Sequence, residues 1–219
     1  MNIAYKYRIY PDKAQAELFA KTFGCVRKVY NLLLDNRIKL HYQANVGLGA
    51  FEYQKPKTPA CFKDEFEYLK DVDSLALANA QLNVNSAFKN FYNNPSSGFP
   101  RFKCKHRDKK TYTTNNQSGS IRLISNNKIR LPKLKDVRIV LHRPFPENGV
   151  LKSATISQRP CGDYYISILF EYESSVEMII PAPDKVLGLD YSSRSLYIDS
   201  ENRSLDSRVS SKTCKNNIN

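Results

Sequence analysis

The feature that most constrains the fold is a change in the spacing of apolar residues along the chain. Between about residues 12 and 92 the apolar positions follow a helical period, whereas from residue 111 onward they alternate with polar ones. Alternation over short runs separated by turns is typical of strands in an antiparallel barrel. The pattern therefore predicts an α+β protein that combines a helical bundle with a small antiparallel β-barrel.

A further strand is predicted at residues 2–10, before the helices. The odd-numbered residues of this run are apolar or aromatic, whereas Lys6, Arg8 and Tyr10 fall on the opposite face. We expect this strand to join the barrel, so that the helices are inserted between it and the remaining strands. The other strands are predicted at residues 121–125, 128–131, 137–141, 152–159 and 164–173.

The helical part is predicted to contain four helices, at about residues 12–23, 25–44, 60–70 and 74–92. Asp12 and Gln15 form a capping-box-like start for the first helix. Gly24 is expected to separate the first two helices, and Ser74 can cap the fourth. The first pair has two interpretations: a helix-turn-helix that reads DNA, or a scaffold hairpin with a basic exterior.

The net charge of +13 is concentrated in one central stretch. Residues 98–143 contain 13 basic and 2 acidic side chains, which gives a local charge of +11. Such a block favours a polyanion, because each neutralised phosphate releases condensed counterions. The alternative is a basic surface that only serves solubility. Aromatic residues are interleaved with the charges, which favours nucleic acid over that alternative and over an anionic membrane.

The segment from Gly98 to Tyr112 is the best candidate for contact with nucleic acid. Its cations can reach phosphates, and its aromatic side chains can stack on bases. The predicted phosphate contacts in the segment are Arg101, Lys103, Lys105, Arg107, Lys109 and Lys110. The predicted stacking residues are Phe99, Phe102, His106 and Tyr112. Further basic candidates outside the segment are Lys6, Arg8, Arg27, Lys28, Arg37, Arg122, Lys128, Arg130, Lys133, Lys135 and Arg138.

The cysteines and the hydropathy pattern indicate a cytoplasmic protein. Five cysteines lie far apart without a C-x-x-C pair, which indicates reduced thiols and no zinc site. No run is apolar for long enough to span a bilayer, and the first residues lack the order of a signal peptide. We therefore expect no membrane partner.

One carboxylate near the end of the sequence has a context typical of nucleases. The apolar run Val186–Asp190 ends in Asp190, and a second apolar run follows at residues 196–198. A nuclease of the ribonuclease H type begins in this way, with a metal-binding Asp on its first strand; the alternative is an Asp that forms a turn or a cap. Two-metal cleavage requires several carboxylates from the whole domain, and 29 residues follow Asp190 (219 − 190). We therefore expect an incomplete active site.

Several segments taken together resemble the TnpB family, the OrfB-type proteins of bacterial insertion sequences. The resemblance runs in order from about residue 3 to residue 201. The segments that carry it are Tyr5–Pro11, Phe23–Asn31, Ser74–Phe91, Gly98–Lys103, Lys128–Lys133, Thr155–Ser157, Gly162–Tyr165 and Val186–Ser192.

The resemblance implies a fold and a set of partners. Proteins of this family are RNA-guided DNA endonucleases with a wedge-like barrel, an inserted helical recognition lobe and a RuvC-type nuclease domain. Guide RNA and double-stranded DNA are the implied partners, and Asp190 matches the first metal-binding position of the RuvC centre. Nothing in this chain corresponds to the family's other acidic ligands or to its zinc-binding cysteine pairs. We therefore expect no cofactor in this chain, and Mg²⁺ only with an intact RuvC domain.

These expectations combine into one organisation of the chain. They are a first barrel strand at 1–10, a helical recognition lobe at 11–97, the rest of the wedge-like barrel at 98–180, a truncated RuvC start at 181–203, and a disordered tail at 204–219. The expected function is the nucleic-acid-binding portion of a transposon protein involved in DNA transposition or recombination. Two alternatives remain: a nuclease-dead, RNA-guided regulator of DNA, and a non-functional remnant of a decayed gene. A separate fragment could also supply the nuclease in trans.

Overall fold

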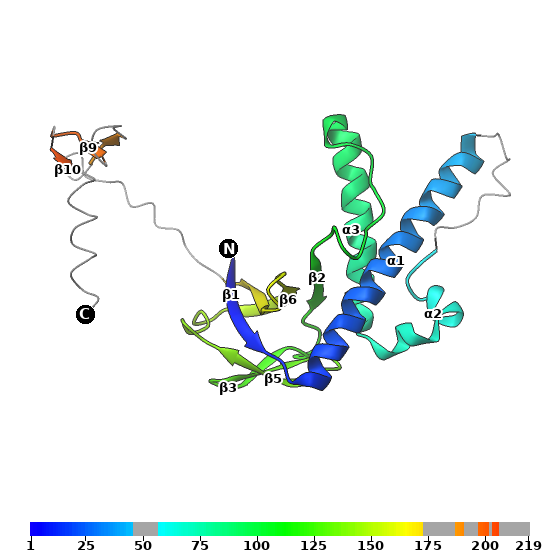
Figure 1. The fold of residues 1–219 in the computed structure, drawn as a ribbon, viewed down its shortest axis with the longest axis horizontal. Coiled ribbons are helices and arrows are strands. Elements are labelled where there is room, and N and C mark those ends of the chain that lie inside the picture. Colours follow the sequence, from blue (N-terminus) through cyan, green and yellow to red (C-terminus); the bar gives the residue numbers. More distant parts are fainter. Residues whose placement is uncertain (46–56, 173–186, 191–196, 202, 206–219) are drawn as a thin grey trace. The chain divides into compact units, whose positions relative to one another are not determined.

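The computed structural model describes residues 1–45, 57–172, 187–190, 197–201 and 203–205 (Figure 1). The chain divides into two compact units, Met1–Ser174 and Ser175–Asn219. We call them unit 1 and unit 2 and describe each by itself. Among the described residues, no helix is both long enough and apolar enough to cross a membrane.

Unit 1 contains a seven-stranded antiparallel sheet that curls like a half-barrel (Figure 1). Its order is β2-β6-β7-β1-β5-β4-β3. The strands are β1 (Asn2–Tyr10), β2 (Lys110–Asn115), β3 (Arg122–Ser125), β4 (Lys128–Leu131), β5 (Lys135–Val140), β6 (Val150–Gln158) and β7 (Tyr164–Glu171). The predicted α+β class and antiparallel sheet are confirmed. Instead of closing into a complete barrel, the described strands leave β2 and β3 as two edges.

The first strand of the chain lies in the middle of this sheet. β1 pairs with β7 over Asn2–Ile9 and with β5 over Arg8–Tyr10. Its predicted two-faced pattern is confirmed, because the side chains toward the core are buried and those on the other face are exposed. The helices follow β1 and precede β2, so they are inserted between two strands of the sheet along the chain, as predicted. Five predicted strands correspond to β3–β7, whereas β2 was not predicted separately.

The first helix, α1, runs without interruption over Lys13–Asn45, so the predicted division at Gly24 is wrong (Figure 1). The apolar stripe keeps its phase across Gly24, with Phe19 and Phe23 buried before it and Val26 and Tyr30 buried after it. Burial of a continuous apolar stripe stabilises a continuous helix, whereas one interior Gly lowers the stability of a helix by only about 1 kcal/mol. The two helices predicted at 12–23 and 25–44 are therefore one helix.

The start of α1 is confirmed as a capping box. The backbone N–H of Gln15 donates to Asp12 Oδ1 at 2.8 Å, and that of Asp12 donates to Gln15 Oε1 at 3.1 Å. The Gln15 amide also donates to the carbonyl oxygens of Leu134 and Asp136. The helix start is thereby tied to the turn between β4 and β5.

The predicted third helix is a pair of short turns, α2 (Phe62–Glu65) and the 3₁₀ turn η2 (Glu67–Asp71). The fourth helix, α3 (Ser74–Asn93), is capped by Asp73 and not by Ser74, because Asp73 Oδ1 accepts the Leu75 N–H at 3.1 Å. The other oxygen of Asp73 accepts a hydrogen bond from the Thr114 hydroxyl on β2. One carboxylate thus joins the helical insertion to the edge of the sheet. A further 3₁₀ turn, η3, covers Pro95–Ser97.

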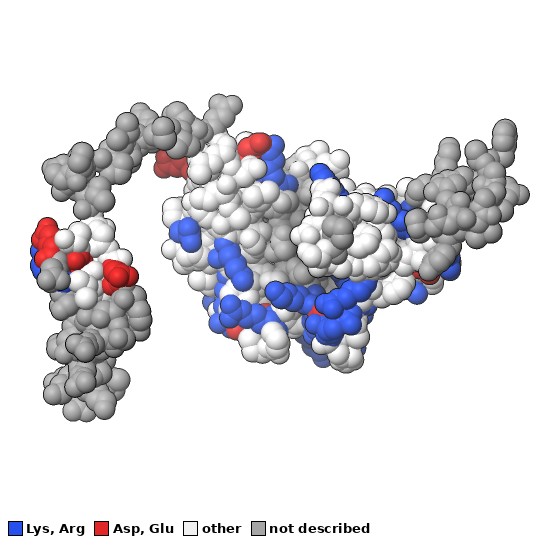
Figure 2. Space-filling view, turned by 90° about the horizontal axis from the view of Figure 1, so that it is seen from above, with Lys and Arg blue, Asp and Glu red and all other residues white. Residues whose placement is uncertain are grey.

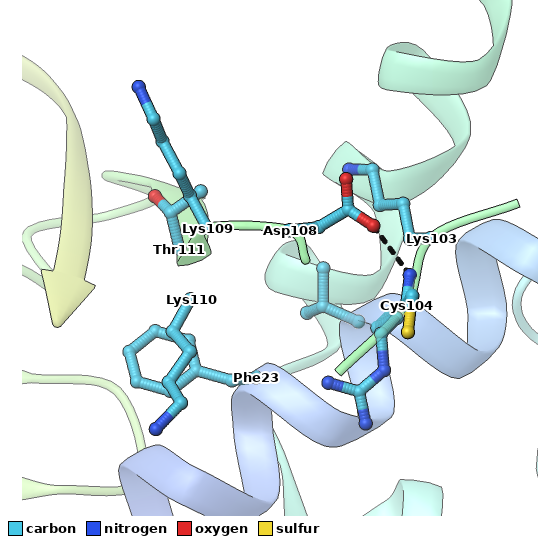
Figure 3. A pocket seen from close by; sticks show the side chains of 9 residues that line it. Phe23, Lys103, Cys104, Asp108, Lys109, Lys110 and Thr111 are labelled. Atoms are coloured by element: carbon cyan, nitrogen blue, oxygen red, sulfur yellow. Dashed lines mark hydrogen bonds between the residues drawn. The ribbon is translucent and has the colours of Figure 1, made fainter. Parts of the chain in front are cut away.

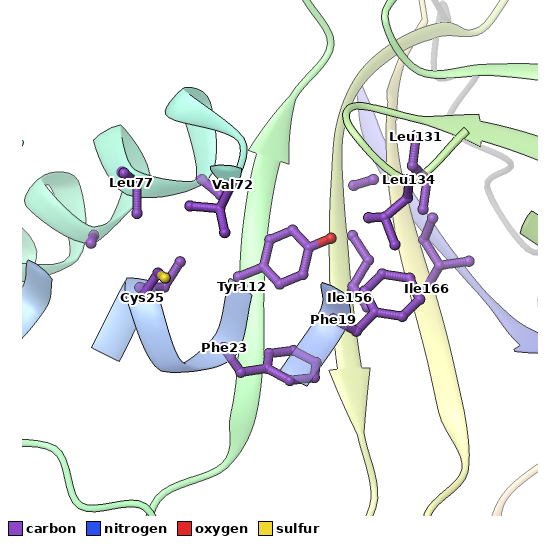
Figure 4. Close-up of a cluster of buried hydrophobic side chains, with 14 of the residues drawn as sticks. Phe19, Phe23, Cys25, Val72, Leu77, Tyr112, Leu131, Leu134, Ile156 and Ile166 are labelled. Carbon is purple, nitrogen blue, oxygen red and sulfur yellow. The ribbon is translucent and has the colours of Figure 1, made fainter. Parts of the chain in front are cut away.

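Helices and sheet share one core, with Tyr112 of β2 inside it (Figure 4). Tyr112 is 4% exposed, and its ring centre lies 5.6 Å from that of Phe23 and 6.4 Å from that of Phe19. Burial raises the pKa of its hydroxyl far above the usual range. The prediction that Tyr112 stacks on bases is therefore wrong, because no face of the ring is available to a ligand.

Unit 2 contains a three-stranded antiparallel sheet of order β10-β9-β8. Its strands are β8 (Leu189–Asp190), β9 (Tyr197–Asp199) and β10 (Ser204–Leu205). The first two agree with the predicted strand pair. β10 corrects the prediction of a disordered tail from residue 204, because Ser204 and Leu205 pair with Ile198 and Tyr197. Residues 181–186 of the predicted RuvC start and the tail from 206 lie outside the described residues.

Candidate nucleic-acid interface

The basic segment between α3 and β2 is held to α1 by the side chain of Asn31. The Asn31 amide donates to the Lys103 carbonyl oxygen at 3.0 Å, and its oxygen accepts the Lys103 N–H at 2.8 Å. This pair of bonds imitates the pairing of two strands, with one side chain in place of a backbone. We call residues 98–110 the clamped segment.

A second contact orients the side chain of Lys103. Its Nζ lies 4.2 Å from the ring centre of Tyr30, within the range of a cation–π interaction. Burial of the ammonium group lowers the pKa of Lys103, and the nearby Asp108 carboxylate opposes that shift. Lys103 is thus half-buried and serves to hold the segment on α1, so it offers less to a phosphate than was predicted.

Asp108 closes the segment into a turn. Its Oδ2 accepts the Cys104 N–H at 2.5 Å, and its own N–H donates to the Cys104 carbonyl oxygen at 3.1 Å. Arg107 donates to the Phe102 carbonyl oxygen at 2.8 Å. The Cys104 N–H and the Arg107 guanidinium hold the pKa of Asp108 below its usual value. Arg107 is therefore largely occupied within the turn.

The remaining cations of the clamped segment point outward. Arg101, Lys105 and Lys109 are exposed, and none of them forms a salt bridge within the described parts of the chain. Lys110 donates to the side-chain oxygen of Gln158 at 3.1 Å. A turn that is held by its own hydrogen bonds and carries uncompensated cations suits phosphate contacts, since little backbone freedom is lost on binding.

An open groove of about 640 Å³ runs along the clamped segment. Phe99 on its wall is 54% exposed and packs edge-on against Phe88 and Phe91 of α3, at 5.6 and 5.4 Å between ring centres. Aromatic and cationic side chains thus share one groove, as stacking of a nucleotide requires. The groove is lined by Tyr30, Ala87, Asn90, Ser97, Gly98, Phe99, Pro100, Arg101, Lys103 and Asp108. The predicted Phe102 is also exposed, at 48%, although it does not line this groove.

A smaller pocket shares Lys103 and Asp108 with this groove (Figure 3). Phe23, Val26 and Arg27 of α1 line one wall, and Lys103–Cys104 and Asp108–Thr111 line the rest. Its volume of about 20 Å³ is enough for about one water molecule. It therefore cannot hold a nucleotide, although it brings Arg27 close to the clamped segment.

The two other predicted cations of α1 make contacts inside unit 1. Arg37 lies 4.7 Å from the ring centre of Phe88 and donates to Asn85 Oδ1 at 2.7 Å. Lys28 lies 4.9 Å from the ring centre of Phe66. Both side chains thus help to fasten neighbouring helical elements to α1.

A second group of predicted cations lies on the outward face of the sheet. Lys6 and Arg8 on β1, Lys128 and Arg130 on β4, and Arg122 on β3 alternate with buried or inward residues of their strands. Two acidic partners compensate part of this charge: Asp163 bonds Arg8 at 2.5 Å, and Asp136 bonds Arg130 at 2.8 and 3.2 Å.

Lysine and arginine side chains crowd one side of unit 1 in Figure 2, with few acidic side chains among them. Lys133, in the turn between β4 and β5, and Lys135, the first residue of β5, are exposed, with φ values of 65° and 60°. The predicted basic residues thus separate into the clamped segment, the helical contacts, the outward face of the sheet and this turn.

Two aromatic residues on the outward face were not among the predicted nucleic-acid-binding residues. Tyr10, on β1, and Tyr165, on β7, both have cationic neighbours within 6 Å of their ring centres. The alternation of β1 had already placed Tyr10 beside Lys6 and Arg8. Tyr165 could have been found in the same way from the alternation of β7.

The predicted metal ligand Asp190 lies on β8 of unit 2 and is exposed. It pairs with Ile198, whereas Asp199 pairs with Leu189, so the two carboxylates project to opposite faces of the hairpin. Asp199 accepts the N–H groups of Glu201 and Arg203 and the Arg203 guanidinium, which hold its pKa low. The described residues contain no group of three or more metal-binding side chains. They therefore do not fit a magnesium pair.

Comparisons with known proteins indicate the family to which this chain belongs. A sequence family described as a helix-turn-helix domain, of the OrfB and IS605 type, matches residues 1–45, which here form β1 and α1. The chain is 31% identical over 181 residues to a putative RNA-guided DNA endonuclease of Streptomyces pristinaespiralis, covering 82% of this chain and 43% of the relative.

Two further relatives extend the comparison. The putative RNA-guided DNA endonuclease InsQ of Escherichia coli is 29% identical over 188 residues, covering 85% of this chain and 44% of that protein. The virulence protein VsdF of Salmonella dublin is 34% identical over 111 residues, covering 47% of this chain and 93% of that protein. The chain thus spans less than half the length of the two endonuclease relatives. It belongs to the TnpB/OrfB family.

Proposed function

We propose that this chain is the part of a TnpB-type protein that binds guide RNA and double-stranded DNA. The observation that carries the proposal is the clamped segment, a rigid turn on α1 that presents Arg101, Lys105 and Lys109 beside an aromatic groove. Two relatives are named as putative RNA-guided DNA endonucleases, which supports RNA and DNA as the polyanions that this segment binds.

The fold supports a finer assignment. The curled sheet of β1 to β7 corresponds to the wedge-like barrel that was predicted at 1–10 and 98–180, and residues 11–97 correspond to the recognition lobe. Residues 181–203 correspond to the start of the RuvC-type domain, with Asp190 as its first carboxylate. In this assignment the chain takes part in the DNA transposition or recombination of a mobile element.

The proposed phosphate contacts of the clamped segment are tested with a matched pair of variants. In the first, Arg101 and Lys105 of the clamped segment are both changed to Glu. In the control, the exposed Lys13 and Lys70 are changed to Glu, so both variants carry the same net charge. Affinity for an RNA hairpin and for a DNA duplex is measured between about 50 and 200 mM salt. Each lost phosphate contact should flatten the log–log slope by about 0.9 on duplex DNA and about 0.7 on single strands. Equal effects in both variants would contradict the proposal.

We further propose that the 219-residue chain does not cut DNA unaided, because its described residues contain no group of three or more side chains that could organise two magnesium ions. A separate nuclease fragment could act in trans. The test incubates the chain with labelled duplex DNA, RNA and Mg²⁺. Cleavage that is lost in Asp190→Ala would refute this proposal.

A second candidate function is regulation, in which the chain occupies DNA under RNA guidance without cleavage. The observation that favours it is that the candidate nucleic-acid contacts belong to unit 1, whereas the described residues of unit 2 contain no group of three or more metal-binding side chains. Repression of a reporter gene that requires a bound RNA would support regulation. Repression without RNA would point to direct DNA recognition instead.

A further inference from the structure

The outward face of the sheet carries a second group of aromatic and basic side chains, distinct from the clamped segment. In the register of the sheet, Arg8 stands opposite Tyr165 on β7, and Tyr10 stands opposite Arg138 on β5. Residues directly opposite each other in antiparallel strands share a face. Neighbouring strands are about 4.8 Å apart, so these side chains form one continuous surface.

Each tyrosine on this surface has two cations beside its ring. Lys6 Nζ and the Arg159 guanidinium lie 5.0 and 4.7 Å from the ring centre of Tyr165. The guanidinium groups of Arg8 and Arg138 lie 5.0 and 5.6 Å from the ring centre of Tyr10. We call these six residues the tyrosine–cation face.

The charge of this face is only partly compensated from within the chain. Asp163 bonds Arg8, whereas Lys6, Arg138 and Arg159 form no salt bridge within the described ranges of the chain. An exposed surface of this kind attracts an anion. Tyr10 is 42% exposed, so part of its side chain remains accessible to a ligand beside the two cations.

The combination indicates which anion fits. An acidic peptide would use the cations but not the rings, and a duplex keeps its bases stacked inside. Unpaired nucleotides offer both phosphates and free base faces, which stack on aromatic rings and on guanidinium planes. Thr155 and Ser157 on β6 belong to the same outward face, and the Thr155 hydroxyl is hydrogen-bonded to that of Thr113 on β2.

We propose that the tyrosine–cation face binds unpaired nucleotides, whose bases stack on Tyr10 and Tyr165 while their phosphates contact the surrounding cations. The inference rests on the proposed function in one respect, namely that the polyanion is a nucleic acid. It adds a binding site outside the clamped segment, and a preference for single strands.

The test uses oligouridine, an RNA duplex with the same number of phosphates, and the 219-residue chain. Tyr10→Leu and Tyr165→Leu should each weaken oligouridine binding by about 5-fold to 100-fold, the range for loss of one base–aromatic stack. Duplex affinity should be unchanged. Tyr10→Phe should bind oligouridine like the unaltered chain, because stacking needs the ring and not the hydroxyl. Tyr68→Leu is the matched control, because Tyr68 lies on η2 and is 43% exposed. Thermal melting of each variant confirms that it is folded.

The outcomes separate the two proposals. If the leucine variants fold and keep their oligouridine affinity, the tyrosine–cation face is refuted, while the clamped segment stands on its own charge-reversal result. If oligouridine and duplex binding fall equally, the face is a general anion surface and the single-strand inference is refuted. If charge reversal in the clamped segment has no effect but the leucine variants lose oligouridine binding, the proposed interface fails and this inference survives.

Discussion

Replacement of Asn31 by alanine should detach the clamped segment from α1. Asn31 makes two hydrogen bonds to the backbone of Lys103, at 3.0 and 2.8 Å, across 72 positions of sequence. Each intramolecular hydrogen bond contributes about 0.5–1.5 kcal/mol net, so the pair should contribute about 1–3 kcal/mol. The cation–π contact of Lys103 with Tyr30 depends on the same backbone position and should weaken with it.

Two assays measure the effect of losing the Asn31–Lys103 hydrogen bonds. Urea unfolding should show a decrease in the free energy of unfolding of about 1–3 kcal/mol. Limited trypsin digestion under native conditions should cut faster after the basic residues of 101–110, because local opening exposes the backbone. RNA affinity should fall as well, since a mobile segment must be ordered again on binding.

The control is Asn85→Ala, which removes a single surface bond to Arg37 and leaves the segment untouched. Unchanged trypsin cutting at 101–110 in Asn31→Ala, together with unchanged RNA affinity, would refute the role of Asn31. A fall in global stability without faster local cutting would also contradict it, because the segment would then be held by other contacts.

Three further predictions concern the fold itself. Gly24→Ala should raise the free energy of unfolding by up to about 1 kcal/mol in urea denaturation, because a methyl group there meets no atom within 4 Å and α1 is continuous; a loss of stability would indicate a break in the helix. Tyr112→Ala should cost about 3–5 kcal/mol, whereas Tyr112→Phe should retain most of the stability and the RNA affinity, because the residue packs the core; a selective loss of RNA binding in the folded Phe variant would contradict this. Asp108 has a folded-state pKa below its ordinary 3.8, so its contribution to stability is present above that value and is lost as the pH falls through the folded-state pKa. Asp108→Asn should therefore reduce the loss of stability measured by urea unfolding between about pH 5 and pH 2, and an unchanged acid profile would argue against the turn.

The outward and inward faces of β1 illustrate what local pattern can determine. Alternation of apolar and polar residues decides which side chains are buried, because a strand has a period of two. The same reasoning predicted β3–β7, and the capping box at Asp12 and Gln15 predicted the start of α1. The concentration of charge in residues 98–143 was likewise visible without coordinates.

Contacts between distant segments decided the rest. Gly24 would favour a break in a short peptide, yet an apolar stripe that is buried on both sides of it holds one helix. Tyr112 looked like a stacking residue because its neighbours in sequence are basic, whereas its strand turns the ring into the core. Composition cannot distinguish a ring on the surface from a ring in the core, because burial depends on residues far away in the chain.

The sequence by itself determined the strand alternation, the cap of α1, the basic block and the family resemblance, since each depends on neighbouring residues or on an ordered set of motifs. Only the tertiary structure decided which cations are engaged by other groups of the chain. Lys103 lies over Tyr30, Arg107 closes a turn, and Arg37 fastens α3, all through partners that sequence order does not place beside them. The physical reason is that charge is a property of one residue, whereas its availability to a ligand depends on every group packed around it.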